Sequence, residues 1–333
     1  MSLDGKRVLI TGGTGSFARN FLKHVLGSSK PEIIRIYSRD EHKQTELLGN
    51  YGGIKGNTDT PVRGFIGDIR DLDRLRMAME GIDIVIHAAA LKQVQSCEYN
   101  PLETIKTNIY GSQNVVQAAL DCNVEKVLAI STDKAVAPLN LYGSTKMVME
   151  KLFINANSYR GKNHRTKFSC TRYGNVADSR GTVVHIWRNQ VERGEPVSVT
   201  DFNATRFWLT MKEANQFVVD CIGLMSELDG GEIFCPRIPS VKVRTIFDAI
   251  IPDGYPYKEI GNRIGDKLHE DLILKEEIPH TTLYKGKYVV LPEEPSWPYN
   301  YPMSIPLNVS GKENITSGNN EVYLDAEQIR TTL

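Results

Sequence analysis

The sequence has little that suits a secreted, membrane-embedded or nucleic-acid-binding protein. Its five cysteines are an odd number without a CxxC pair, which predicts reduced thiols. No apolar run approaches the ~20 residues of a membrane helix, and no signal-peptide h-region precedes the first apolar strand. Forty basic residues balance forty acidic ones, which argues against nucleic-acid or membrane binding. We therefore expect a soluble, cytoplasmic protein.

An alternation of apolar strands and amphipathic helices fills the first half of the 333 residues. Strands are predicted at 7–10, 32–38, 82–90, 126–131 and 168–173, with a further strand ending near 66. Helices are predicted at 17–26, 71–80, 101–122 and 142–160. Because the strands are apolar throughout, both faces of their sheet should be covered. This pattern predicts an α/β fold of the Rossmann type with a doubly wound parallel sheet.

The alternation weakens after about residue 178, where short strands, prolines and charged turns take over. We predict a nucleotide-binding domain over 1–178 and a smaller lobe, mainly for substrate binding, over 179–333, interleaved with the first. The polar stretch 308–320 is expected to be a disordered tail or a loop ordered by substrate or by a neighbouring subunit. Residues 321–333 are expected to include a short helix.

A glycine loop, TGGTGSFA at 11–18, lies between the first predicted strand and the first predicted helix. Gly12 allows a tight turn, and Gly15 lets the backbone approach a pyrophosphate, whose charge the helix N-terminus favours. Ala18 supplies the third small residue of the fingerprint. An ordinary glycine-rich turn is the alternative, but the position at the first strand of an alternating chain favours a dinucleotide site.

The tip of the second strand carries cations where an NAD site usually has a carboxylate. Ser38 and Arg39 come first, and Lys43 follows. A hydroxyl and two cations suit a 2′-phosphate, so the expected cofactor is NADP, with a solvated charged turn as the alternative. Asp68 and Ile69 suit the adenine edge, and the alanines at 88–90 suit close packing along the cofactor.

Two polar motifs predict the chemistry. Tyr142 and Lys146 form a YxxxK pair, which shares one face of a helix, and the lysine cation is expected to lower the pKa of the tyrosine. Thr132, Asp133 and Lys134 follow the strand 126–131 directly, at the sheet edge where open α/β folds place their chemistry. After a dinucleotide fingerprint, these motifs are typical of short-chain dehydrogenases.

The chain resembles a family over essentially its whole length. The runs that carry the resemblance are TGGTGSFA, YSRDEHKQ, GDIRD, HAAALKQV, STDKA, NLYGSTK, RYGNV, SRGTVV, TRFWLT, GGEIF and GDKLHE. They are similar to the UDP-N-acetylglucosamine 4,6-dehydratases, most of all to the soluble, 5-inverting members that begin pseudaminic acid synthesis. Membrane-anchored members have methionine at the position of Tyr142. The departures are Ala18 for glycine, Gln93 for histidine and Arg237 for lysine.

This resemblance implies roles for the polar motifs. Tyr142, helped by Lys146 and Thr132, would take the proton of the sugar 4-hydroxyl while hydride passes to the cofactor. Lys134 would then remove the carbon-5 proton, and Asp133 would protonate the departing 6-hydroxyl. A lysine base requires a lowered pKa, which we expect burial beside the nicotinamide to supply.

The resemblance and the motifs together define the expected binding residues. Those for the cofactor are Gly12, Thr14, Gly15, Ser16, Phe17, Ala18, Ser38, Arg39, Lys43, Asp68, Ile69, Ala88, Ala89, Ala90, Asn108, Tyr142, Lys146, Tyr173 and Val176. Those for the UDP-sugar are Lys92, Asn175, the segment 180–184 with Arg180, Gly181 and Val184, then Thr200, Arg206, Arg263 and Asp266, with Asn319 and Asn320 from the tail. No metal is expected, because the seven histidines have no metal-ligand spacing. The family resemblance also implies a homo-oligomer, either a dimer or a hexamer.

Three alternatives remain open at this point. A 5-retaining dehydratase would give the D-xylo 4-keto sugar, and no motif reports the stereochemistry directly. A nucleotide-sugar 4-epimerase would share the fold, although it needs no elimination and therefore no Asp133–Lys134 pair. A non-catalytic NADP-binding regulator usually loses the tyrosine or lysine, and both are intact.

Overall fold

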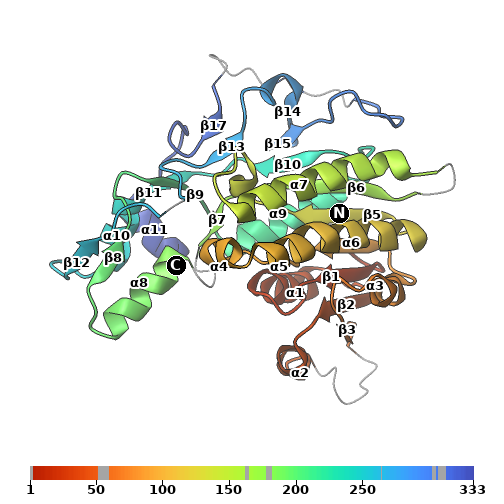
Figure 1. Cartoon of the computed structure of the whole chain (residues 1–333), viewed down its shortest axis with the longest axis horizontal. Coiled ribbons are helices and arrows are strands. Elements are labelled where there is room, and N and C mark those ends of the chain that lie inside the picture. The colour runs from red at the N-terminus through yellow and green to blue at the C-terminus, as the bar shows by residue number, and fades with distance from the viewer. Residues whose placement is uncertain are drawn as a thin grey trace.

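A mixed sheet of ten strands forms the centre of the computed structural model (Figure 1). The structure describes residues 3–51, 60–161, 165–177, 182–263, 265–301, 305–306 and 313–333. From β10 to β3 the neighbours are parallel, whereas β15, β14 and β16 add antiparallel strands at one edge. The predicted doubly wound parallel sheet is therefore confirmed. In spatial order the strands are β16 (Ile305–Pro306), β14 (Thr281–Tyr284), β15 (Lys287–Val290), β10 (Ile233–Pro236), β6 (Lys167–Thr171), β5 (Lys126–Ile130), β4 (Ile84–His87), β1 (Arg7–Thr11), β2 (Ile33–Ser38) and β3 (Val62–Ile66).

Helices cover both faces of this sheet. Helices α1 (Ser16–Ser28) and α9 (Met211–Leu224) pack on one face, and α3 (Leu72–Met79), α6 (Gly111–Asp121) and α7 (Leu141–Asn155) pack on the other. The alternation along β1 shows why: Val8 and Ile10 face the first layer, whereas Leu9 faces the second, and all three are fully buried. Helix α2 (Glu41–Gly49) lies beside β3 at the far edge.

The expected helix over 101–122 consists of three pieces. Helix α5 (Pro101–Ile105) leads into a π-helical turn, Lys106–Tyr110, which continues into α6, while the short α4 (Val94–Tyr99) comes just before. The π turn places Asn108 inside the protein, where its amide bonds both backbone groups of Leu91 and the hydroxyl of Thr145. Such turns widen a helix locally and often occur near functional sites.

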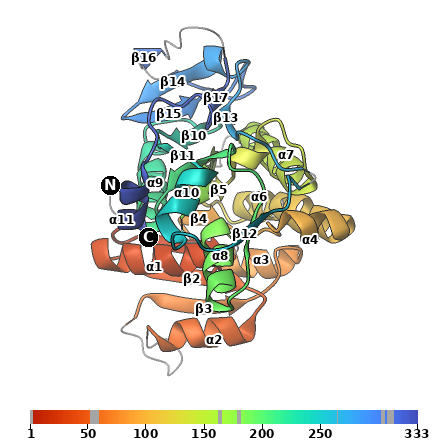
Figure 2. The same cartoon turned by 90° about the vertical axis from the view of Figure 1, so that its left-hand side faces the viewer.

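A smaller lobe lies beside the sheet, and Figure 2 views the molecule from the side of this lobe. Its core is formed around Trp187, Phe247 and Ile329, and the indole N–H of Trp187 donates to the carbonyl of Ser198. The elements of the lobe are β7 (Asn175–Val176), β9 (Thr205–Leu209) and β11 (Ser240–Lys242) in one sheet, the pair β8 (Val197–Val199) with β12 (Tyr257–Glu259), and helices α8 (Val183–Glu192), α10 (Val243–Ile250) and α11 (Ala326–Thr332). A further pair, β13 (Asp271–Ile273) with β17 (Ile315–Thr316), packs Leu272 and Ile273 into the core of the large sheet.

The chain crosses between the two units several times. After α8 and β9 it returns to the large sheet as α9 and β10, and β14 and β15 extend that sheet later. The segment after residue 178 therefore contributes strands and helices to both units, and the domain boundary at residue 178 stays a prediction.

A buried cation ties three of these elements together. Arg172, at the end of β6 and 3% exposed, is bonded to Glu150 of α7 at 2.7 Å and to Glu277 at 2.9 Å. Its guanidinium also donates to the carbonyl of Leu272 in β13. Burial alone would lower the pKa of Arg172, but the two carboxylates outweigh it and raise the pKa above its ordinary value. Loss of this cation would leave two buried carboxylates facing each other.

We therefore expect Arg172→Met to destabilise the protein by about 3–5 kcal/mol, the cost of breaking a buried ion pair on one side. Denaturant unfolding followed by circular dichroism measures the effect. Lys106→Met, which removes an exposed cation beside Glu103, is the matched control and should change the midpoint little. A midpoint for Arg172→Met equal to that of the control would contradict this role.

Candidate active site

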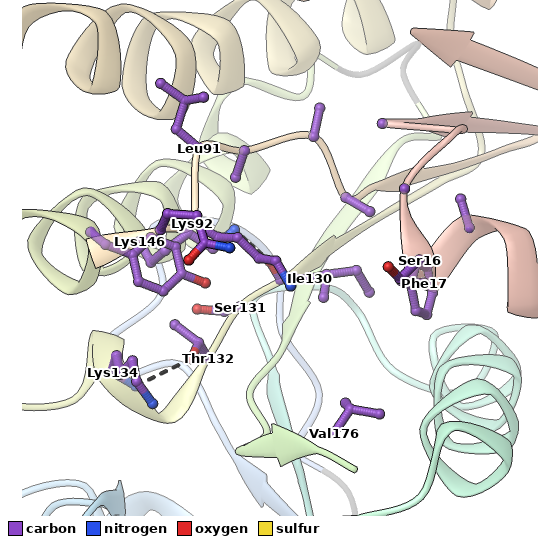
Figure 3. Close-up of a pocket in the computed structure, with 18 of the residues that line it drawn as sticks. Ser16, Phe17, Leu91, Lys92, Ile130, Ser131, Thr132, Lys134, Lys146 and Val176 are labelled. Atoms are coloured by element: carbon purple, nitrogen blue, oxygen red, sulfur yellow. Dashed lines mark hydrogen bonds between the residues drawn. The ribbon is translucent and has the colours of Figure 1, made fainter. Parts of the chain in front are cut away.

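A cleft of about 840 Å³ runs from the glycine loop, across the carboxyl ends of the parallel strands, to the lobe. Figure 3 shows Ser16 and Phe17 of α1 at one end and Lys134, Thr132 and Ser131 at the other. Most of the expected cofactor residues line it: Gly12, Thr14, Gly15, Ser16, Phe17, Ala18, Ser38, Arg39, Lys43, Asp68, Ile69, Ala88, Ala89, Ala90, Tyr142, Lys146, Tyr173 and Val176. Asn108 is the exception, because it lies behind the wall and holds the backbone of Leu91.

The glycine loop has the shape that a pyrophosphate needs. Gly12 has a φ of +67°, and a Cβ there would lie 2.9 Å from the Cα of Ala89. Gly15 is the N-cap of α1 and offers no side-chain cap, so the first N–H groups of the helix face the cleft without a capping partner. These groups and the helix dipole fit an anion at this point.

A buried hydrogen-bond chain supports the opposite wall of the cleft. The Thr11 hydroxyl lies 2.8 Å from His87 Nδ1 and accepts from the backbone N–H groups of Ala88 and Ala89. Burial lowers the pKa of His87 to about 3, so its ring is neutral and bonds Ser112 through Nε2. No motif in the sequence points to the contact between Thr11 and His87, because these residues lie on two strands that are far apart in the chain.

Charged groups cluster where β2 ends. The Ser38 hydroxyl accepts from Gln44, Arg39 lies 3.7 Å from Asp68, and Lys43 lies 2.6 Å from Asp40. Burial alone would raise the pKa of Asp68, but hydrogen bonds from Arg70 outweigh it and the pKa lies below its usual value. Both cations thus have carboxylate partners, and both line the cleft.

The YxxxK pair lies on the first turns of α7. The Lys146 amine donates to the carbonyl of Ile130 at 2.5 Å, and burial lowers its pKa to about 8. Burial also raises the pKa of Tyr142 to about 12, and the cation that opposes this rise is Lys134. The prediction that Lys146 would lower the pKa of Tyr142 is therefore wrong here, because the Lys146 amine is turned toward the end of β5.

The loop that follows β5 forms a short 3-10 helix, Asp133–Ala135, capped by Thr132. The Lys134 amine lies 3.2 Å from Asp133 Oδ1, 3.1 Å from Glu270 Oε1 and 3.4 Å from Asn175 Oδ1. Burial alone would lower the pKa of Lys134, but the two carboxylates outweigh it and raise the pKa. The prediction of a lowered pKa for Lys134 is wrong, because no motif in the sequence points to the Glu270 carboxylate that helps to raise it.

Asp133 is fully buried, and burial raises the pKa of its carboxyl. Its Oδ1 accepts from the Thr132 hydroxyl, and its Oδ2 has no hydrogen-bond partner among the described residues. Glycines allow the backbone to approach this loop closely: a Cβ at Gly174 would lie 3.0 Å from Asp133 Oδ2, and one at Gly143 would overlap the carbonyl of Lys134.

The expected sugar-binding residues divide into three groups. Those that line the cleft are Lys92, Asn175, Arg206, Arg263 and Asp266, joined by Thr182 and Val183 of the segment 180–184. Arg180 and Gly181 lie outside the described residues. Those away from the lining are Val184, 1% exposed in the lobe core, Thr200, Asn319, which bonds Thr316, and Asn320, which bonds Ile238 and Ser240.

No helix within the described ranges is long and apolar enough to cross a membrane. In the same ranges, no group of three or more His, Cys, Asp or Glu side chains could hold a metal ion.

The tight approach of Gly12 to Ala89 generates a prediction. Gly12→Ala should abolish retention of a dinucleotide, because a Cβ would strain the positive φ and fill the cradle. Gly27→Ala is the control, since a Cβ on Gly27 of α1 meets nothing within 4 Å. Thermal unfolding with and without NADP⁺ measures binding in both variants, and a wild-type thermal shift in Gly12→Ala would contradict the assignment.

Comparison with known proteins bears on this site. The chain is 45% identical to the UDP-N-acetylglucosamine 4,6-dehydratase (inverting) of Campylobacter jejuni subsp. jejuni serotype O:23/36 (strain 81-176), with 87% of this chain and 84% of the relative covered. It is 37% identical to a UDP-glucose 4-epimerase of Rickettsia massiliae (strain Mtu5), over 82% of this chain and 79% of that protein.

Among solved structures, the X-ray structure of Pen from Bacillus thuringiensis is similar, with a TM-score of 0.87 and 32% identity over 99% of this chain and 97% of that chain. The family described as polysaccharide biosynthesis protein matches residues 8–292, which include most of β1, the glycine loop, the segment 132–134, the YxxxK pair and Glu270. The chain belongs to this family.

Proposed function

We propose that the protein is an inverting UDP-N-acetylglucosamine 4,6-dehydratase. It converts UDP-N-acetylglucosamine to UDP-2-acetamido-2,6-dideoxy-β-L-arabino-hex-4-ulose and water. The observation that carries the proposal is the contact of the Lys134 amine, in the cleft that Tyr142 also lines, with the fully buried carboxyl of Asp133. Similarity to the Campylobacter enzyme, which bears this name, supports the same reaction.

The cofactor that we propose is NADP. Ser38, Arg39 and Lys43 supply a hydroxyl and two cations at the end of β2, where the 2′-phosphate of an adenosine would lie. A bound nicotinamide would supply the hydride acceptor that oxidation of carbon 4 requires and the hydride donor that carbon 6 requires.

Oxidation of carbon 4 requires a base for the 4-hydroxyl proton. Tyr142 takes this role, because its phenol lies in the cleft beside Thr132 and Lys134. Burial raises the pKa of the phenol, and Lys134 and Thr132 oppose this rise and so favour the ionised form. Lys146 fixes the end of β5 through the carbonyl of Ile130.

Elimination of water requires an acid and a base on neighbouring carbons. A ketone at carbon 4 acidifies the carbon-5 proton, which Lys134 removes. Asp133 gives its proton to the departing 6-hydroxyl, and its raised pKa favours the protonated form that an acid needs. Arg206, Arg263 and Lys92 line the same cleft and supply positive charge for a diphosphate.

We also propose that the protein works as a homo-oligomer. Tyr99, Leu102 and Tyr110, on consecutive turns of α4, α5 and the π turn, are 87%, 71% and 56% exposed. Exposed apolar side chains of this size often mark contact surfaces.

A cytoplasmic location stays a prediction from the sequence.

The reaction is tested by incubating the protein with UDP-N-acetylglucosamine in D₂O and following the product by NMR. We expect a 4-keto-6-deoxy sugar of L-arabino configuration with deuterium at carbon 5. Lys134→Ala should lower turnover by at least ~10²-fold, because it removes the base. A D-xylo product from the first time point would show retention, and a product that differs only at carbon 4 would show an epimerase.

The cofactor is tested separately. Wild-type protein should bind NADP⁺ more tightly than NAD⁺, and Arg39→Asp should reverse this preference, because a carboxylate repels the 2′-phosphate and accepts from the ribose hydroxyls. Calorimetric titration with each cofactor gives both affinities. Equal wild-type affinities would argue against NADP.

A further inference from the structure

Glu270 is a buried carboxylate in the cleft wall that has no role in the mechanism above. It ends the segment before β13, is 3% exposed, and lies 3.1 Å from the Lys134 amine. Arg206 Nε is 3.8 Å from the same oxygen. Its other oxygen, Oε2, is buried without a hydrogen-bond partner among the described residues.

Lys134 is thereby held between two carboxyl groups, from Asp133 at 3.2 Å on its own loop and from Glu270 at 3.1 Å on the lobe side. Their side chains are 0% and 4% exposed, so neither is well solvated. Asp133 must hold a proton to act as an acid, and Lys134 must be neutral to act as a base. When Asp133 holds its proton, the carboxylate that still fixes the Lys134 amine is therefore that of Glu270.

We propose that Glu270 is a positioning residue for Lys134: its carboxylate, 3.1 Å from the amine, holds Lys134 in the cleft where the carbon-5 proton is removed. This inference rests on the proposed function. Without this carboxylate, the Lys134 amine would lose the contact that fixes it from the side opposite its own loop.

The surroundings suit an ionised Glu270. Burial alone would raise its pKa, but the charges of Lys134, Arg206 and Lys267 outweigh burial and lower it. Burial raises the pKa of Asp133, so the two carboxyls are shifted in opposite directions. These shifts fit a protonated Asp133 that acts as the acid and an ionised Glu270 that holds the Lys134 amine.

The C-terminal segment fixes Glu270 through its backbone. The N–H of Glu270 donates to the Ser317 hydroxyl at 2.9 Å, and the N–H of Ser317 donates to the carbonyl of Glu270 at 2.8 Å. Ser317 is fully buried and also bonds Thr205. Ser317 belongs to the polar stretch 308–320, for which the sequence predicts a disordered tail or a loop ordered by substrate or a neighbouring subunit, and it contacts Glu270 within the chain itself.

The first experiment needs no substrate. Competitive acetylation with acetic anhydride over a range of pH, read by mass spectrometry, gives the pKa of Lys134 in the full-length protein. Glu270→Gln should lower this pKa by about 1–3 units, the range for an opposite charge within ~4–6 Å. Asp271→Asn is the control, because its carboxylate bonds Lys267 and Asn314 instead. An unchanged pKa in Glu270→Gln would overturn the proposal.

The second experiment separates the two half-reactions in the enzyme with bound cofactor. On mixing with UDP-N-acetylglucosamine, Glu270→Gln should lower kcat by about 10²-fold with little change in KM. Reduced nicotinamide should accumulate at 340 nm, because carbon-4 oxidation by Tyr142 precedes the blocked step. Glu270→Asp, which keeps the carboxylate, should restore part of the rate.

Two results would overturn the proposal: wild-type turnover in Glu270→Gln, or a loss of turnover without accumulation at 340 nm and without rescue by aspartate. The latter would assign Glu270 a structural role only. Failure of the wild-type protein to convert the sugar would contradict the proposed function instead, and the acetylation experiment would then still decide whether Glu270 controls the protonation of Lys134.

Discussion

The buried Arg172 guanidinium is the interaction on which the geometry of the cleft depends. It joins the end of β6, the helix α7 and the segment around Glu277. Helix α7 carries Tyr142 and Lys146, whereas the chain just before β13 carries Glu270. One desolvated cation therefore holds the two walls of the active site together, and it can do so only because two carboxylates compensate its charge.

Around this connection, the groups that the proposed mechanism uses for oxidation and for elimination come from different parts of the fold. Tyr142, the proposed base for oxidation, lies on α7, and the glycine loop lies at the carboxyl ends of parallel strands, where loops from separate βα units meet. Lys134, the proposed base for elimination, lies at the seam with the lobe, since it is bonded to Asn175 of β7 and to Glu270. A lobe contribution therefore distinguishes this site from a plain Rossmann nucleotide site.

Local patterns in the sequence were sufficient to predict the parallel sheet, the glycine loop and the two catalytic motifs, because strand ends and i, i+4 spacing determine which of these side chains are neighbours. They were not sufficient for Glu270, Ser317 or the Thr11–His87 contact, which join segments far apart in the chain. The direction of the Lys134 pKa was wrong for the same reason, since it depends on a carboxylate from the lobe.

The absence of a side chain at Gly143 has a consequence for how such enzymes diversify. Because the helix that carries Tyr142 rests on the backbone of Lys134, the spacing between the redox centre and the elimination centre is set by main-chain contact. Side chains at 133 and 134 can then change without moving the backbone on which this helix rests, although their charges also affect the pKa of Tyr142. The same backbone arrangement of α7 and the loop after β5 can in this way support either a reversible oxidation alone or an oxidation that is followed by loss of water.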